Sequence, residues 1–125
     1  MKNEKELEGP ISELNLALNS LTCVGVMNLL LRPSILYHLT SLNLEHNNSI
    51  GDKGLIFLID NIFLRSLVDL NLTNTGIGRP STSSILKIHQ GFPSLELLVL
   101  KENSFPESDK KAIEFQLSSY LKLSF

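Results

Sequence analysis

Leucines recur along the chain in short segments where apolar and polar positions alternate. Four segments share the spacing Leu/Ile-x-x-Leu-x-Leu, and they begin at Ile11, Leu39, Leu67 and Leu95. Each start lies 28 residues after the previous one. Because alternate side chains of an extended strand share a face, each segment predicts a short strand with one apolar side. Equal intervals predict four repeats, at residues 11–38, 39–66, 67–94 and 95–122.

Apolar residues recur at helical spacing between the predicted strands. Two further columns of the 28-residue period are apolar throughout, and they contain Leu29, Phe57, Ile85 and Ile113, and Leu36, Leu64, Phe92 and Tyr120. Alternating strands and helices predict a parallel sheet. Pro33 is expected to end the first helix near Leu31, and Pro80 and Pro106 mark the starts of later helices. The run 91–93, Gly-Phe-Pro, is expected to end the third helix.

The period also carries a family pattern. Residues 11–21 and 95–105 fit Leu-x-x-Leu-x-Leu-x-x-Asn-x-Leu without a gap, with isoleucine or phenylalanine at some leucine positions. Over about residues 11–122 the chain resembles leucine-rich-repeat proteins, and residues 50–55 resemble a turn of the ribonuclease-inhibitor-like subclass. The resemblance implies an α/β fold, namely a right-handed solenoid of four repeats bent into a horseshoe arc. Parallel strands would line its concave side and helices its convex side.

Asparagines at the ends of the predicted strands are expected to support the turns. Asn19, Asn47 and Asn103 are predicted to turn inward and to bond the backbone of the loops. Two departures from the pattern alter these turns. The third repeat has Thr75 at the asparagine position, and the second repeat has one extra residue at 47–49.

The two ends of the chain differ in how well they could cover the predicted core. Residues 1–10 form a short lead-in, where Leu7 is the main apolar side chain besides Met1, and residues 123–125 form the C-terminal end. The N-terminal edge of the first repeat is therefore expected to be exposed. Such an edge predicts either a fragment of a longer solenoid or self-association through that edge.

The composition favours a folded protein without a nucleic-acid or membrane partner. Apolar residues make up 42% and charged residues 19%, and the net charge of -2 offers no positive surface for nucleic acid. The apolar runs are too short to span a bilayer, and the charged N-terminus does not resemble a signal peptide. One cysteine, Cys23, fits a reducing compartment and is expected to be buried. We expect a cytoplasmic protein, with the nucleus as the alternative.

Residues between the strand leucines are expected to point outward and to bind a protein partner. The predicted contact residues lie in these columns and in the turns that follow: Asn15, Asn43, Glu45, His46, Asp69, Asn71, Asn74, Lys101 and Glu102. The asparagine column 15-43-71 has two interpretations, a sequence kept after duplication or a row of amides for a partner. On the second, arginine at both 43 and 71 would abolish binding with little change in melting temperature.

Catalytic and cofactor chemistry is not indicated. His38, His46 and His89 occupy different parts of the repeat, so no metal or cofactor is expected. Residues 76–81 lack the Gly-Lys-Ser/Thr ending of a phosphate loop. The sequence therefore favours a non-catalytic protein-interaction module or scaffold. The alternatives are a fragment of a Ran-type GTPase-activating protein, with Arg79 as the candidate arginine, and the recognition segment of a ubiquitin-ligase adaptor or bacterial effector.

Overall fold

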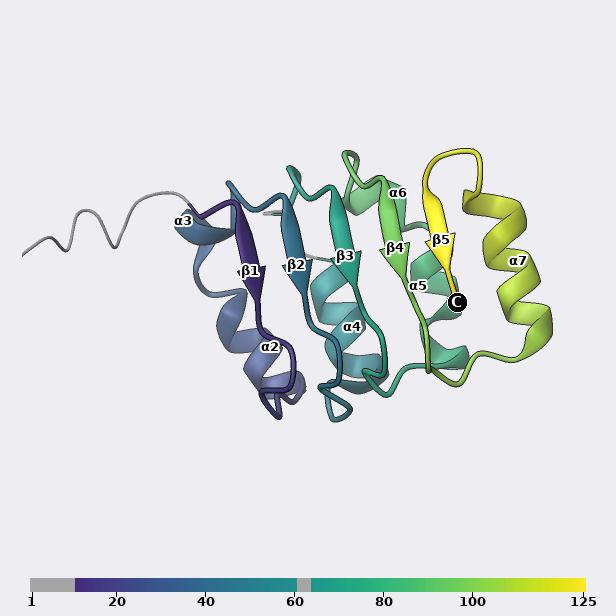
Figure 1. Cartoon of the computed structure of the whole chain (residues 1–125), viewed down its shortest axis with the longest axis horizontal. Helices are drawn as coiled ribbons and strands as arrows, with labels where there is room; N and C mark the ends of the chain where they lie inside the picture. The colour runs from purple at the N-terminus through teal and green to yellow at the C-terminus, as the bar shows by residue number, and fades with distance from the viewer. Residues whose placement is uncertain (1–10, 61–63) are drawn as a thin grey trace, which may run out of the picture.

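Five short parallel strands form one sheet in the computed structural model, which describes residues 11–60 and 64–125 (Figure 1). The strands, in the order in which they neighbour one another, are β1 (Glu13–Asn15), β2 (Ser41–Asn43), β3 (Asp69–Asn71), β4 (Leu97–Val99) and β5 (Lys122–Ser124). Leu14, Leu42, Leu70 and Leu98 are aligned in the register of β1 to β4. The prediction that the four leucine segments lie side by side is therefore confirmed. The lead-in proposed for residues 1–10 lies outside the described residues.

Helices connect the strands, so the α/β class is confirmed. They are α2 (Cys23–Leu29), α3 (Pro33–Leu36), α4 (Gly51–Ile59), the 3-10 helix η1 (Arg79–Ser81), α5 (Thr82–Leu86), α6 (Ile88–Gly91) and α7 (Glu107–Leu117). The prolines lie at the boundaries of helices. Pro33 follows the end of α2 but also begins α3, because a missing N–H costs no hydrogen bond in a first helical turn. Pro106 precedes α7, and α6 ends at Gly91, as expected. No helix among the described residues is long and apolar enough to cross a bilayer.

The fifth strand is not among the four that the period predicts. Leu123 in β5 pairs with Leu98, an interval of 25 residues rather than 28. The interval is shorter because α7 ends at Leu117 and the chain reaches the sheet again within a few residues. Leu121, in this short return, is only 7% exposed. Packing at the end of α7 thus adds a strand outside the 28-residue period.

One face of the sheet forms the core. Leu42, Leu70 and Leu98 on this face are at most 1% exposed and lie in one cluster with buried residues of α4, α5 and α7, whereas Leu14 on β1 and Leu123 on β5 are partly buried. Tyr120 departs from its otherwise buried column, because it is 59% exposed and stacks on His89 with ring centroids 4.7 Å apart. Cys23, expected to be buried, is half-buried.

Two of the three turn asparagines face inward as predicted. Asn47 is fully buried. Its Oδ1 accepts hydrogen bonds from the backbone N–H groups of Asn19 and Leu21 at 3.0 and 2.8 Å. Its Nδ2 donates to the carbonyl groups of Leu16 and Leu44 at 2.8 and 2.9 Å. Asn47 therefore joins the loop after β2 to the loop after β1.

Asn103 and Asn19 show why position in the sheet matters. Asn103 forms the corresponding bonds between the loops after β3 and β4. The prediction that Asn19 turns inward was wrong, because this residue is exposed; among the described residues its Nδ2 bonds the loop backbone only at the carbonyl of Ala17. Asn19 follows β1, and the structure describes no earlier loop for it to join.

Thr75 changes the junction between the loops after β2 and β3. Its hydroxyl donates to the carbonyl of Leu72 within the same loop, at 2.9 Å. The neighbouring loop is instead joined through the backbone, where Gly51 N–H donates to the Thr75 carbonyl at 2.9 Å. Gly76 has a φ of +77°, and a Cβ there would collide with the carbonyl oxygen of Asn48. Glycine is therefore required at this close approach.

Candidate binding face of the sheet

The sheet has a second face, which is turned away from the core. We call this the strand face, and it is formed by the outward side chains of the five strands: Glu13, Asn15, Ser41, Asn43, Asp69, Asn71, Leu97, Val99, Lys122 and Ser124. The register arranges them in two rows across the strands. One row runs from Glu13 through Asp69 to Lys122, and the other contains the asparagine column. The face is polar on β1 to β3 and apolar on β4.

The asparagine column closes the turns that follow the strands. Oδ1 of Asn15 accepts from Ala17 N–H, and Oδ1 of Asn43 accepts from Glu45 N–H, both at 3.0 Å. Oδ1 of Asn71 accepts from the N–H and the hydroxyl of Thr73, at 3.0 and 2.7 Å. An asparagine that bonds the backbone two residues ahead stabilises a turn. The column lies on the strand face, but its oxygens already have a structural role.

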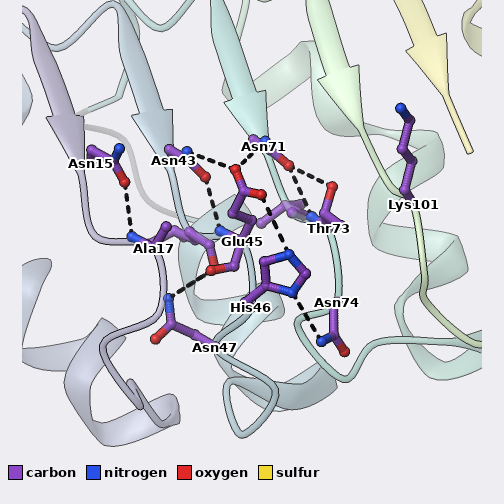
Figure 2. A network of polar contacts seen from close by, with 12 residues as sticks. Asn15, Ala17, Asn43, Glu45, His46, Asn47, Asn71, Thr73, Asn74 and Lys101 are labelled. Atoms are coloured by element: carbon purple, nitrogen blue, oxygen red, sulfur yellow. Dashed lines mark hydrogen bonds and ion pairs between the residues drawn. The ribbon is translucent and has the colours of Figure 1, made fainter.

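Glu45 joins two of these asparagines. Its carboxylate Oε2 accepts from Nδ2 of Asn43 at 2.9 Å and from Nδ2 of Asn71 at 3.2 Å (Figure 2). The other oxygen, Oε1, lies 3.5 Å from Nε2 of His46. The carboxylate is thus surrounded by donors from β2, β3 and its own turn.

A chain of amides orients His46. Nδ2 of Asn48 donates to Oδ1 of Asn74 at 2.9 Å, which leaves Nδ2 of Asn74 facing Nδ1 of His46 at 3.2 Å. Because that amide nitrogen can only donate, Nδ1 accepts and the ring proton lies on Nε2, toward Glu45. Five predicted contact residues therefore share one network, drawn in Figure 2: Asn43, Glu45, His46, Asn71 and Asn74.

The other predicted contact residues are not part of this network. Asp69 is half-buried, and its carboxylate has no hydrogen bond or ion pair with any described residue. Lys101 and Glu102 are exposed on the loop after β4, and Lys101 lies apart from the network in Figure 2. Asn15 is exposed at the edge strand. Contact of these residues with a partner stays a prediction.

A shallow hollow of about 200 Å³ lies on the strand face over β2, β3 and β4. Asp69 and Asn71 line one part of it, and Leu97 and Val99 line another. Leu97 and Val99 were not among the predicted contact residues. A signal for them exists in the sequence, because they are apolar at outward positions where the other strands carry polar residues.

Metal-binding side chains do not cluster in the described part of the chain. No three histidine, cysteine or acidic side chains gather there to hold a metal ion. Arg79 has a side chain that is 67% exposed, and its Nε lies 3.4 Å from Oδ2 of Asp109. The guanidinium therefore has a carboxylate partner on α7.

One comparison with known proteins identifies a motif. A family model described as Leucine Rich repeat matches residues 38–58, which span β2 and most of α4. No curated protein matches the chain. The matched segment contributes Leu39, Leu42 and Leu44 to the core, at no more than 1% exposure. Residues 38–58 are thus similar to a leucine-rich repeat, and they lie in a fold with a parallel sheet.

Proposed function

We propose that this chain is a non-catalytic protein-recognition module that binds a protein partner through the strand face and the adjoining loops. The observation that carries the proposal is the two-sided sheet. One face belongs to the core, whereas the other presents polar and apolar side chains around a hollow. Recognition of proteins commonly combines such an apolar centre with polar surroundings.

The finer architecture is part of this proposal. We infer a right-handed solenoid of four leucine-rich repeats, of the ribonuclease-inhibitor-like subclass, in a cytoplasmic protein. The 28-residue offsets that pair β1 with β2, β2 with β3 and β3 with β4 support the repeats. The link between Arg79 and Asp109 supports a structural role for this arginine, and hence the non-catalytic function over the GTPase-activating alternative.

The loops are needed because the strand face alone is small. Five strands spaced about 4.8 Å apart give a width of about 19 Å, and strands of three residues give a length of about 10 Å. The resulting area of roughly 190 Å² is well below the roughly 800 Å² that one partner contributes to a standard interface. The loops that carry Glu45, His46, Lys101 and Glu102 therefore belong to the proposed surface.

The test uses two arginines placed where no described side-chain hydrogen bond is lost. Ser41→Arg with Leu97→Arg would fill the hollow, whereas arginines at 43 and 71 would also break the turn bonds of those asparagines. We expect the double variant to lose the partners that the wild-type chain captures from its source cells. Its melting temperature should change by only a few degrees, as expected for surface substitutions.

The matched control carries the same charge on the helical side. Ser83→Arg with Gln116→Arg places two arginines on exposed positions of α5 and α7, and it should retain every partner. If the helical pair abolishes capture and the strand-face pair does not, partners bind the helical side of the molecule, and the proposal is wrong.

Self-association is a second proposal, supported by a specific observation at one end of the sheet. Leu18, Val24 and Leu31 are 75%, 59% and 76% exposed, and all three lie in or near α2. No strand among the described residues pairs with the outer edge of β1. Exposed apolar side chains and an open strand edge both favour association with another copy.

A further inference from the structure

We propose that the hollow on the strand face accepts an arginine or lysine side chain of the protein partner. The charged group would bind the Asp69 carboxylate, and the aliphatic stem would pack on Leu97 and Val99. This inference rests on the proposed function, since it names the partner chemistry that the strand face selects.

The carboxylates on the strand face and in the turns beside it differ in how many hydrogen bonds they already accept. Glu45 already receives hydrogen bonds from Asn43 and Asn71 and has His46 at 3.5 Å. Asp69 has no such partner among residues 11–60 and 64–125. A carboxylate can accept about four hydrogen bonds, so Asp69 retains the capacity for a two-pronged contact with a guanidinium.

The wall beside Asp69 is apolar. In the register of β3 and β4, Leu97 is the partner of Asp69 and Val99 is the partner of Asn71, so both apolar side chains lie one strand away, about 4.8 Å. Arginine and lysine side chains pack their methylene stems on such surfaces while the charged end contacts a polar group. The hollow therefore offers both parts of a basic side chain a suitable surface.

Other occupants fit less well. An apolar side chain would cover Asp69 without offering it a hydrogen bond, which leaves a desolvated carboxylate. A carboxylate would be repelled by Asp69. A volume of about 200 Å³ is also below the roughly 300 Å³ at which small-molecule pockets begin, so one side chain is the better match.

The charges in the row from Glu13 to Lys122 also favour a basic side chain in the hollow. Glu13 and Asp69 lie in the same row on β1 and β3, and Glu45 follows β2, whereas the first cation of the row is Lys122 on β5. Negative charge thus gathers on the β1 to β3 side of the hollow. A basic residue of the partner is attracted to this side by more than one carboxylate.

The experiment selects random dodecapeptides displayed on phage against the full chain. Counter-selection against the Ser41→Arg, Leu97→Arg variant keeps the peptides that need the strand face. We expect the enriched peptides to share a basic residue. In synthetic peptides, arginine→citrulline or lysine→norleucine should weaken binding by about tenfold or more, as should Asp69→Asn in the protein. The two changes combined should cost no more than either alone, because they remove the same contact.

Two further variants separate the parts of the contact. Glu13→Gln removes a carboxylate from the same row and should change affinity by less than about threefold, because its charge is more distant and solvent-screened. Leu97→Ala removes part of the apolar wall and should weaken binding without changing charge. Asp69→Asn is close in shape to the wild type, and its thermal melt, measured in parallel, is expected to match.

The outcomes distinguish this inference from the proposed function. Peptides that need the strand face but bind Asp69→Asn as well as the wild type would overturn the basic-side-chain assignment and leave the proposed function intact. A selection that recovers no peptide dependent on the strand face would overturn both.

Discussion

Asparagines at the end of a strand and asparagines in the loop after it have different structural roles in this chain. Asn15, Asn43 and Asn71 close turns at the strand ends and remain at least partly exposed. Asn47 and Asn103 turn inward and bond the backbone of two neighbouring loops. The second role requires burial of the amide, so its loss should cost more stability.

We predict that Asn47→Ala lowers the free energy of unfolding by about 2–4 kcal/mol, because it leaves several buried backbone groups without partners. Asn19→Ala is the matched control. Asn19 is exposed and donates one side-chain hydrogen bond, so its loss should cost no more than about 0.5 kcal/mol. Urea unfolding followed by circular dichroism measures both, and equal losses would contradict the bridging role of Asn47.

Neighbouring elements are linked by aspartates that reach from one connection to the next. Asp52 in α4 accepts from Gly78 N–H at 2.9 Å and from the Ser81 hydroxyl at 2.5 Å. Asp109 in α7 accepts from the Thr82 hydroxyl at 2.8 Å and from Arg79 at 3.4 Å. The bonded residues are 26 to 30 positions apart, close to the 28-residue interval, so each aspartate joins the start of one helix to the corresponding part of the neighbouring connection.

The Asp109 link predicts a dependence of stability on pH. The hydrogen bond from Thr82 lowers the pKa of the Asp109 carboxyl, and Arg79 and Ser108 lower it further against the opposing effect of partial burial. A carboxyl whose pKa is lower in the folded than in the unfolded state stabilises the fold above its unfolded pKa. That stabilisation is lost as the pH falls through the pKa of the folded state.

We therefore expect the urea midpoint of the wild type to fall between about pH 5 and pH 2 more steeply than that of Asp109→Asn. Glu107→Gln serves as the control, since this exposed carboxyl precedes Asp109 by two residues and has no partner in the described part of the chain. Parallel acid profiles for the wild type and Asp109→Asn would show that the link does not stabilise the fold.

At the scale of the whole molecule, the two ends of the sheet differ. At the β5 end, Phe125 packs edge-on against Phe105 with centroids 6.4 Å apart, and Nζ of Lys110 lies 5.8 Å from its ring centroid. Around α2, near β1, apolar side chains remain exposed among the described residues. Phe115 and Tyr120 are also exposed near α7, but more apolar side chains are exposed around α2, namely Leu18, Val24, Met27 and Leu31. We therefore place the proposed self-association at the β1 end (Figure 1).

Sedimentation velocity tests that placement. We expect concentration-dependent association of the wild-type chain, and Val24→Lys with Leu31→Lys should weaken it by about tenfold or more, because two exposed apolar side chains are replaced by mutually repelling charges. Phe115→Lys is the control at the other end, where Phe115 is 90% exposed on α7. A wild-type chain that stays monomeric at all concentrations would rule out self-association, and dissociation by Phe115→Lys would place it on α7.

Much of the fold follows from local pattern. The spacing of Leu14, Leu42, Leu70 and Leu98 predicts a set of neighbouring strands, since each strand must turn its leucine toward the same core. The outward columns follow from the same alternation. Most of the predicted contact residues are therefore found on the strand face or in the turns beside it, although their part in binding stays a prediction.

Contacts between residues far apart in the sequence form only in the tertiary structure. They determine the features that the repeat pattern did not predict. Leu123 joins the sheet outside the period because the chain returns to the sheet within a few residues of the end of α7, and Asn19 is exposed because the described sheet begins at β1. Glu45 accepts a hydrogen bond from Asn71, which is 26 residues away, whereas Asp69 has no described partner. Periodicity determines which way a side chain points. The hydrogen-bond partners of that side chain are residues that only folding brings within reach.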